Sequence, residues 1–144
     1  MNMMKPLILA AALALTACVP QTKAASNIEI LGNNGGDFYI YREGIFDHWI
    51  AGGTYSVRGF CGSACTMILM MGPSVCTYPE ATWAFHAASR NGVIEPSVTE
   101  DVRSYYPPGL QVWFGQNAAH LHGADYAQLS GAEMIDAGYV KECL

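Results

Sequence analysis

The stretch that decides the fold is residues 54–71, TYSVRGFCGSACTMILMM, where a predicted strand leads into a run of apolar residues. Residues 54–60 have the composition of a strand, and Ser63 is a residue type that caps helices. The run at 64–71 is apolar on every side, which predicts a helix buried in the protein interior. The centre of the fold is therefore expected near residue 63.

Strands and helices are predicted to alternate on both sides of this stretch. Strands are expected at residues 27–31, 54–60, 75–78 and 82–86, and helices at 37–50, 64–71, 110–121 and 131–137. Asp37 can cap the first helix, where Phe38, Tyr41, Ile45, Phe46 and Trp49 form one apolar face. Residues 87–108 are polar and are expected to be irregular. This order predicts an α/β domain with right-handed crossovers and a mostly parallel sheet.

Composition limits what the chain can be. Its 144 residues suffice for one domain, and its low charge content of 13% with 11% aromatic residues is unlike that of a disordered protein. The formal net charge of −5 leaves no basic patch for phosphates, so no nucleic-acid partner is expected.

The N-terminus has the pattern of an export signal. Lys5 precedes an apolar run at residues 7–15, which is shorter than the roughly 20 residues that a membrane span needs. The small residues before Cys18 resemble the bacterial lipobox, in which the cysteine thiol receives a diacylglycerol. Cleavage would remove residues 1–17 as a lipoprotein signal peptide. A simple signal peptide cut near Ala24 is the alternative.

The expected mature protein begins with a tether at residues 18–26, followed by one domain at 27–144. Lipid on Cys18 would hold it at a bacterial membrane, on the periplasmic side. Val19 after the cysteine resembles the pattern that favours the outer membrane.

The other four cysteines are Cys61, Cys65, Cys76 and Cys143. An even number in an oxidising compartment predicts two disulfides, for which three connectivities are available. We expect the pairs Cys61–Cys65 and Cys76–Cys143. A metal site is less favoured, because the close pair is C-x3-C without a second pair or a histidine at zinc-like spacing. His120, His122 and Asp125 are a weaker metal alternative.

Three features could together carry nucleophilic chemistry. Ser63 opens a helix after a strand, His86 ends another strand, and the turn Asn34-Gly35-Gly36 lets a backbone N–H approach a ligand. A serine nucleophile needs a base such as histidine, and its oxyanion needs N–H donors, here those of Gly35 and Ala64. Taken singly, these residues have simpler interpretations as a helix cap, a structural histidine and a turn.

In combination, the order and spacing of these features resemble the Clp-protease/crotonase superfamily, and within it the exported Clp-like proteins of bacteria. The residues in question are the Gly-Gly turn, the helix to residue 50, the strand 54–60, Ser63, Gly72 and Phe85-His86. Residues 129–140, LSGAEMIDAGYV, resemble a helix and turn of that family. The resemblance implies a spiral of β-β-α units, truncated at its N-terminal side.

The resemblance further implies Ser63 as nucleophile, His86 as general base, and Gly35 and Ala64 as oxyanion-hole donors. The family's acid would fall at Tyr126, so the neighbouring Asp125 is the candidate third member, with a Ser–His dyad as the alternative. The family's long helix after the histidine is expected to be reduced to a loop. No cofactor is expected. No ATPase partner is expected either, because no ATP pool exists outside the cytoplasm.

Three functions remain from the sequence. The first is an exported, membrane-tethered serine hydrolase that acts on peptide or protein substrates through Ser63 and His86. The second is a catalytically inactive lipoprotein of the same fold that serves as a binding or envelope-assembly module. The third is a thiol–disulfide protein built on Cys61 and Cys65.

Overall fold

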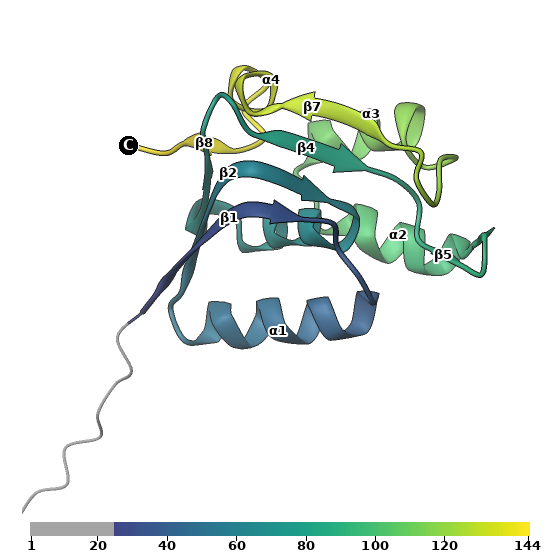
Figure 1. The fold of residues 1–144 in the computed structure, drawn as a ribbon, viewed down its shortest axis with the longest axis horizontal. Coiled ribbons are helices and arrows are strands. Elements are labelled where there is room, and N and C mark those ends of the chain that lie inside the picture. The colour runs from purple at the N-terminus through teal and green to yellow at the C-terminus, as the bar shows by residue number, and fades with distance from the viewer. Residues whose placement is uncertain (1–24) are drawn as a thin grey trace, which may run out of the picture.

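The computed structural model describes residues 25–144, so the expected signal peptide, Cys18 and most of the tether lie outside the described residues. The elements follow in the order β1 (Asn27–Asn33), α1 (Phe38–Ile50), β2 (Thr54–Gly62), η1 (Ser63–Ser74), β3 (Val75–Thr77), β4 (Thr82–Phe85), β5 (Ser89–Arg90), β6 (Val93–Ile94), α2 (Pro96–Ser104), α3 (Pro108–Asn117), β7 (Ala127–Ser130), α4 (Gly131–Asp136) and β8 (Lys141–Glu142). The 3₁₀ helix η1 lies beside the sheet, and α1 packs on η1 (Figure 1).

The six-stranded sheet is built around β2. Its strand order is β7-β4-β2-β3-β8, and β1 also pairs with β2. Along the edge of β2 away from β1, residues 55–57 pair with β3 and residues 60–62 pair with β4. These pairs and β3–β8 are parallel, whereas β4 and β7 are antiparallel. The predicted α/β class with a mostly parallel sheet is thus confirmed.

The first helix begins as the sequence predicts. The Asp37 carboxylate accepts hydrogen bonds from the backbone N–H groups of Tyr39 and Ile40, which are otherwise unpaired at a helix start. Its predicted apolar face is only partly correct. Phe38 and Ile45 are buried, but Phe46 and Trp49 are 47% and 40% exposed, because the layer of η1 covers only one side of α1.

The buried helix after β2 is confirmed, but its cap is not. Gly62 occupies the N-cap position of η1, and no side chain caps this end. Ser63 has φ +55°, the left-handed region, so its side chain is not placed to cap the helix. The backbone turns at Gly72, φ +52°, close to the predicted end.

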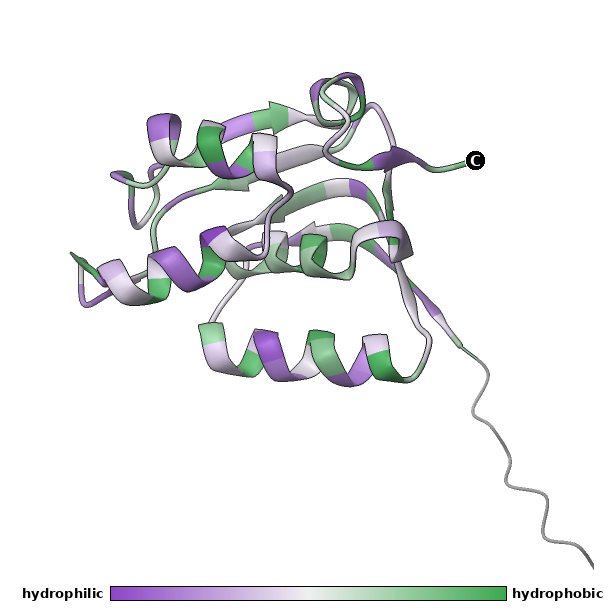
Figure 2. Ribbon diagram, turned by 180° about the vertical axis from the view of Figure 1, so that it is seen from behind, coloured by the Kyte–Doolittle hydropathy of each residue, from purple (hydrophilic) through white to green (hydrophobic). Residues whose placement is uncertain are grey.

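The region predicted to be irregular contains defined elements, so this prediction is wrong. Strands β5 and β6 form a hairpin, and α2 follows with Pro96 in its first turn. Helix α2 buries Thr99 and Val102, three residues apart on one face, and it also carries hydrophilic residues (Figure 2). A helix, α2, therefore stands where the sequence predicted a loop.

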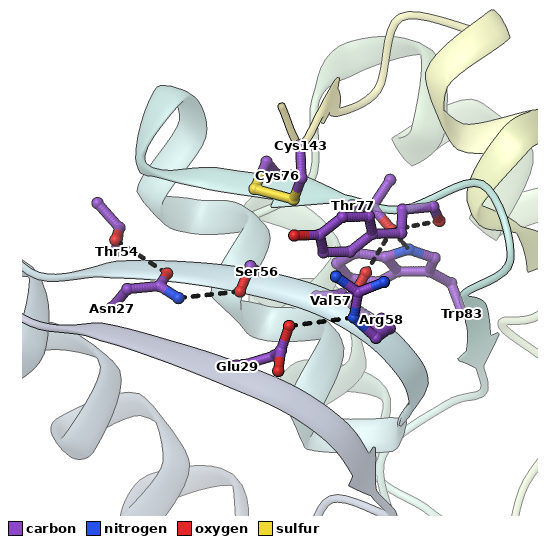
Figure 3. Close-up of a disulfide and its surroundings, with 11 residues drawn as sticks. Asn27, Glu29, Thr54, Ser56, Val57, Arg58, Cys76, Thr77, Trp83 and Cys143 are labelled. Carbon is purple, nitrogen blue, oxygen red and sulfur yellow. Dashed lines mark hydrogen bonds and ion pairs between the residues drawn. A yellow bond between two sulfur atoms is a disulfide. The ribbon is translucent and has the colours of Figure 1, made fainter.

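Both predicted disulfides are present. Cys61–Cys65 joins the end of β2 to the first turn of η1, and Cys76–Cys143 joins β3 to the residue after β8. Figure 3 shows the second disulfide on the sheet, near the hydrogen bond from Trp83 Nε1 to Thr77 Oγ1. The C-terminal strand is thus attached to the sheet both by pairing and covalently.

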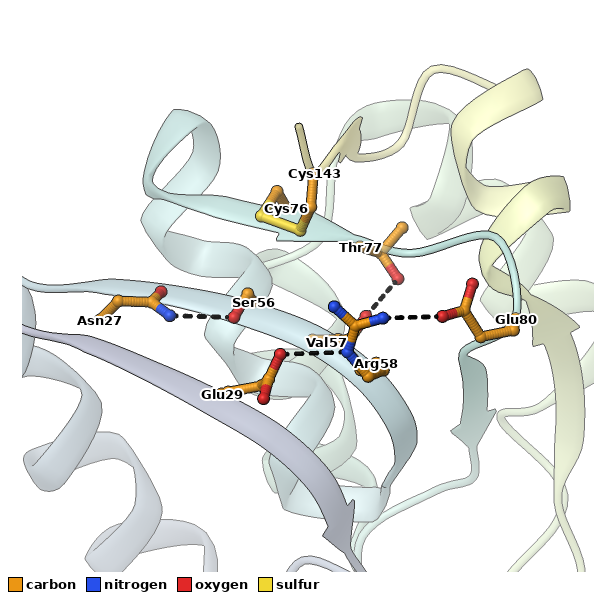
Figure 4. Close-up of polar contacts among 9 residues, drawn as sticks. All are labelled: Asn27, Glu29, Ser56, Val57, Arg58, Cys76, Thr77, Glu80 and Cys143. Atoms are coloured by element: carbon orange, nitrogen blue, oxygen red, sulfur yellow. Dashed lines mark hydrogen bonds and ion pairs between the residues drawn. A yellow bond between two sulfur atoms is a disulfide. The ribbon is translucent and has the colours of Figure 1, made fainter.

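The sheet face in Figure 4 carries a polar network. Arg58 on β2 binds Glu29 on β1 at 3.1 Å and Glu80 before β4 at 3.0 Å (Figure 4). Its guanidinium also lies 3.5 Å from the ring centroid of Tyr78. Because these partners are largely exposed, each ion pair contributes little, and the network mainly marks this face as solvated.

The last helix, α4, matches its prediction. Ser130 and Glu133 form a capping box at its start, and Gly138 follows with φ +71°. The core between the sheet and the helices holds Val57, Met67, Trp83, Phe85, Leu110, Phe114 and Met134. Of the helices within residues 25–144, none is both long and apolar enough to cross a membrane.

Candidate functional site

The sheet topology brings Ser63 and His86 together. Strands β2 and β4 are parallel neighbours, so the residues that follow them lie at the same edge of the sheet. The Nε2 atom of His86 is 2.7 Å from the Ser63 hydroxyl oxygen. Two residues separated by 23 positions in the sequence therefore form a hydrogen-bonded pair, as the sequence predicts.

The backbone at Ser63 is held from one side by two buried hydroxyl groups. The Thr66 hydroxyl donates to the Ser63 carbonyl at 2.7 Å and lies 2.7 Å from the Tyr106 hydroxyl. Because the Thr66 proton is used for Ser63, Tyr106 is the donor in the second bond. Burial raises the pKa of Tyr106, so it keeps its proton and this chain of bonds at ordinary pH.

The Cys61–Cys65 disulfide encloses the nucleophile candidate. It spans a sequence separation of four, with Gly62, Ser63 and Ala64 between its ends. Both cysteines are buried, at 0% and 1% exposure. The left-handed turn at Ser63 costs a non-glycine residue about 1–2 kcal/mol, and the disulfide is one of the constraints that hold the chain in it.

The glycine turn after β1 touches the start of η1. A Cβ atom on Gly35 would lie 2.6 Å from Ala64 N and 2.7 Å from Gly62 O, and Gly35 has φ +76°. Only glycine fits there. However, the Gly35 N–H donates to Asn33 Oδ1 at 2.9 Å, so it is occupied, and its predicted role as oxyanion donor is wrong.

Gly36 is the better donor on this side. No acceptor for its N–H is found within residues 25–144, and Gly36 lines the same cleft as Ser63 and Ala64. Ala64 N–H lies in the first turn of η1, where helical N–H groups have no intrahelical partner. The backbone groups available for an oxyanion are thus those of Gly36 and Ala64.

His86 is set up to be neutral. Desolvation lowers its pKa below the ordinary value, and the nearby His122 lowers it further. The backbone of Gly123 acts in the opposite direction but does not reach hydrogen-bond geometry at Nδ1, which is buried and has no partner among the described residues. A neutral imidazole with its proton on Nδ1 presents Nε2 as an acceptor to Ser63.

Asp125 is not the partner of His86, which corrects the predicted triad. Asp125 lies exposed in a turn, where its N–H donates to the His122 carbonyl. The next side chain faces the imidazole instead. The Tyr126 ring centroid is 4.6 Å from that of His86, with the planes inclined by 37°.

The Ser63–His86 pair lies in a cleft of about 340 Å³. Its apolar lining includes Phe38, Met67, Val98 and Val102, and its polar lining includes Asp37, Arg90 and Glu95. Helix α2, which the sequence did not predict, supplies the two valines. The cleft therefore offers an apolar wall beside a serine hydroxyl and two backbone N–H groups.

Two other predicted sites are not formed. No group of three or more histidine, cysteine or acidic side chains could hold a metal ion in the part of the chain that the structure describes, which includes His120, His122 and Asp125. Cys61 and Cys65 are joined in a buried disulfide, whereas an exchanging thiol must be accessible. The thiol–disulfide hypothesis therefore has no structural basis.

The sequence did not predict the roles of three residues of the site. The N–H of Gly35 is bonded to Asn33 and that of Gly36 has no acceptor within residues 25–144, which the sequence does not reveal. Tyr126 contacts His86 next to the paired strands β4 and β7. Tyr106 reaches Thr66 from 40 positions away. Comparison of the chain with models of known protein families and with curated proteins found no match.

Proposed function

We propose that the protein is an exported serine hydrolase that acts on peptide or protein substrates. The observation that carries this proposal is the 2.7 Å contact between the Ser63 hydroxyl and His86 Nε2, in a cleft with two free N–H groups. A serine hydroxyl becomes a nucleophile when a neutral base is within hydrogen-bond reach. The lowered pKa of His86 supports that role.

The reaction would follow the usual steps of acyl transfer. The Ser63 oxygen attacks the substrate carbonyl carbon while its proton passes to His86 Nε2. The oxyanion accepts hydrogen bonds from Gly36 N–H and Ala64 N–H, and the tetrahedral intermediate collapses as His86 returns the proton to the leaving amine. Water then attacks the acyl-serine, with His86 as base, and releases the acid and free Ser63.

The finer fold assignment belongs to the same proposal. We infer a Clp/crotonase-like domain at residues 27–144, truncated at its N-terminal side. The sequential β1-α1-β2-η1-β3-β4 arrangement, with serine after β2 and histidine after β4, supports it. The domain would act without cofactor or ATPase partner.

The location is also a proposal. Residues 1–17 would be removed on export and lipid on Cys18 would anchor the protein on the periplasmic side, preferably at the outer membrane. The two disulfides support an oxidising compartment. Labelling cells with a radioactive fatty acid tests the anchor: the wild type should incorporate it and Cys18→Ser should not.

An inactive binding module is the second candidate, and one observation favours it. His86 Nδ1 has no acidic partner in the described residues. The short Ser63–His86 distance favours the hydrolase instead, since a module that has lost activity has no need to keep this contact.

A fluorophosphonate probe separates the two functions. The folded wild type should form a stable adduct on Ser63 with loss of fluoride, and Ser63→Ala should abolish labelling. Ser104→Ala removes an exposed hydroxyl on α2 and should label like the wild type. If folded wild type is not labelled at any pH from roughly 6 to 9, the hydrolase proposal is rejected.

A further inference from the structure

His86 is oriented without an acid in the described residues. Its Nε2 atom contacts Ser63, its Nδ1 atom is buried without a partner, and one face of its ring meets the ring of Tyr126. An imidazole attached through two rotatable bonds does not keep Nε2 directed at one atom unless something restricts its rotation. In this site the restriction comes from the contact with Ser63, from the nearby backbone of Gly123 and from packing against Tyr126.

Strand pairing sets Tyr126 opposite His86. In the antiparallel ladder of β4 and β7, Thr82 pairs with Ser130 and Phe85 pairs with Ala127. Continuing this register by one position places His86 across from Tyr126. Cross-strand neighbours of this kind have their side chains in contact, as the 4.6 Å separation of the two rings confirms.

Tyr126 is itself fixed by a second aromatic ring. Phe60 on β2 meets it edge to face, with centroids 6.2 Å apart and planes inclined by 82°. The Phe60 ring in turn lies over Gly62, where an added Cβ would come within 2.6 Å of it. A continuous stack therefore runs from the residue before Ser63, through Phe60 and Tyr126, to His86.

We propose that Tyr126, packed against the ring of His86, is the positioning residue for the general base, a task that an acid performs in a triad. This inference rests on the proposed hydrolase function. The Tyr126 ring limits rotation of the imidazole, keeps Nε2 directed at Ser63 and shields the protonated Nδ1 from water. The ring performs this task, and the tyrosine hydroxyl is not required for it.

Three variants test the assignment through the rate of fluorophosphonate labelling. Tyr126→Phe keeps the ring and should label within about twofold of wild type, while Tyr126→Ala should label about tenfold more slowly. Asp125→Asn should label like wild type. The loss in Tyr126→Ala should lie in the maximal labelling rate and not in the half-saturating probe concentration, because the cleft lining is unchanged.

A control and a spectroscopic measurement separate positioning from general destabilisation. Tyr78→Ala removes a tyrosine that does not line the cleft, and it should destabilise the protein without slowing labelling. The nitrogen NMR signals of His86 should show one neutral tautomer, protonated at Nδ1, in wild type and Tyr126→Phe. In Tyr126→Ala they should move toward the averaged tautomers of free histidine.

The outcomes distinguish this inference from the proposed function. If wild type is labelled but Asp125→Asn is slowed about tenfold, or if Tyr126→Ala labels like wild type, the positioning role of Tyr126 is overturned while the hydrolase stands. If folded wild type is not labelled at all, both fall together. Slow labelling of Tyr126→Ala, with rescue by Tyr126→Phe, supports the assignment.

Discussion

The two disulfides allow a test that separates stability from reactivity. Cys61–Cys65 encloses Ser63, whereas Cys76–Cys143 joins the C-terminal strand to β3, away from the cleft residues. Replacing each pair by alanine removes one covalent link of the same chemistry. Of the two links, the first constrains the turn that contains Ser63, the proposed nucleophile.

The loop lengths give the expected stability losses. The cysteines of the first pair are four positions apart and those of the second are 67 apart. Loop-closure entropy then gives a loss of about 2 kcal/mol for Cys61→Ala/Cys65→Ala and about 4 kcal/mol for Cys76→Ala/Cys143→Ala. Urea unfolding followed by tryptophan fluorescence measures both values.

Reactivity should change in the opposite order. Without the Cys61–Cys65 link, Ser63 can leave its left-handed conformation, and both its hydroxyl and the Ala64 N–H lose their positions. We expect fluorophosphonate labelling to fall by about tenfold or more in this variant. The other double variant should label within about twofold of wild type when assayed well below its unfolding midpoint.

The refuting result is a labelling rate that simply follows stability. If Cys76→Ala/Cys143→Ala lost more reactivity than Cys61→Ala/Cys65→Ala, the disulfide around Ser63 would have no special role at the site. Equal labelling of both variants and wild type would lead to the same conclusion, because the remaining contacts of Ser63 would then suffice.

Three further predictions concern the same turn and its base. Gly35→Ala should lose labelling and at least about 2 kcal/mol of stability, because its Cβ collides with backbone atoms, whereas Gly92→Ala, at φ +76° in open space, should lose only about 1 kcal/mol and no reactivity. Ser63→Gly should be more stable than Ser63→Ala by about 1 kcal/mol in denaturant titration, since both lack the hydroxyl and only glycine tolerates φ +55°. Labelling should rise with pH through the pKa of His86, with a midpoint below 6.5. Because the pKa of His86 is lowered in the folded protein, the unfolded chain binds this proton more readily. The free energy of unfolding should therefore fall as pH drops below 6.5, and this fall should be smaller in His86→Gln. A labelling midpoint above 6.5 would contradict the burial argument.

Local signals in the sequence were sufficient for much of the framework. Asp37, the glycines at 52–53 and the alternating residues of β1 and β2 each specify structure through neighbours a few positions away. The serine–histidine pair was predicted from the order and spacing of the glycine turn, Ser63 and His86, and the parallel pairing of β2 and β4 is what brings the two residues together. The even number of cysteines predicted two disulfides without specifying their pairing, and the pairs that we expected are the ones present.

The wrong predictions concern features that depend on contacts between residues far apart in the sequence. Serine is a residue type that often caps helices, and Ser63 was expected to do so. In the structure Ser63 has a left-handed backbone conformation, lies against the glycine turn, and is followed by the buried Thr66–Tyr106 pair. Helix α2 has few apolar residues, because much of its surface is solvated. Its apolar residues were therefore too few to predict a helix from their spacing. The partner of His86 depends on the antiparallel register of β7, which no local signal in the chain specifies.

The link between Cys76 and Cys143 also changes what a single cut in the backbone would do. The exposed turn at Asn91-Gly92 lies between these cysteines in the sequence. Cleavage there leaves a fragment carrying Ser63 and His86 and a second carrying Tyr126, with one cysteine of the pair in each. The two fragments stay joined as long as the disulfide is oxidised, so a nicked molecule keeps its complete site and separates only under reducing conditions.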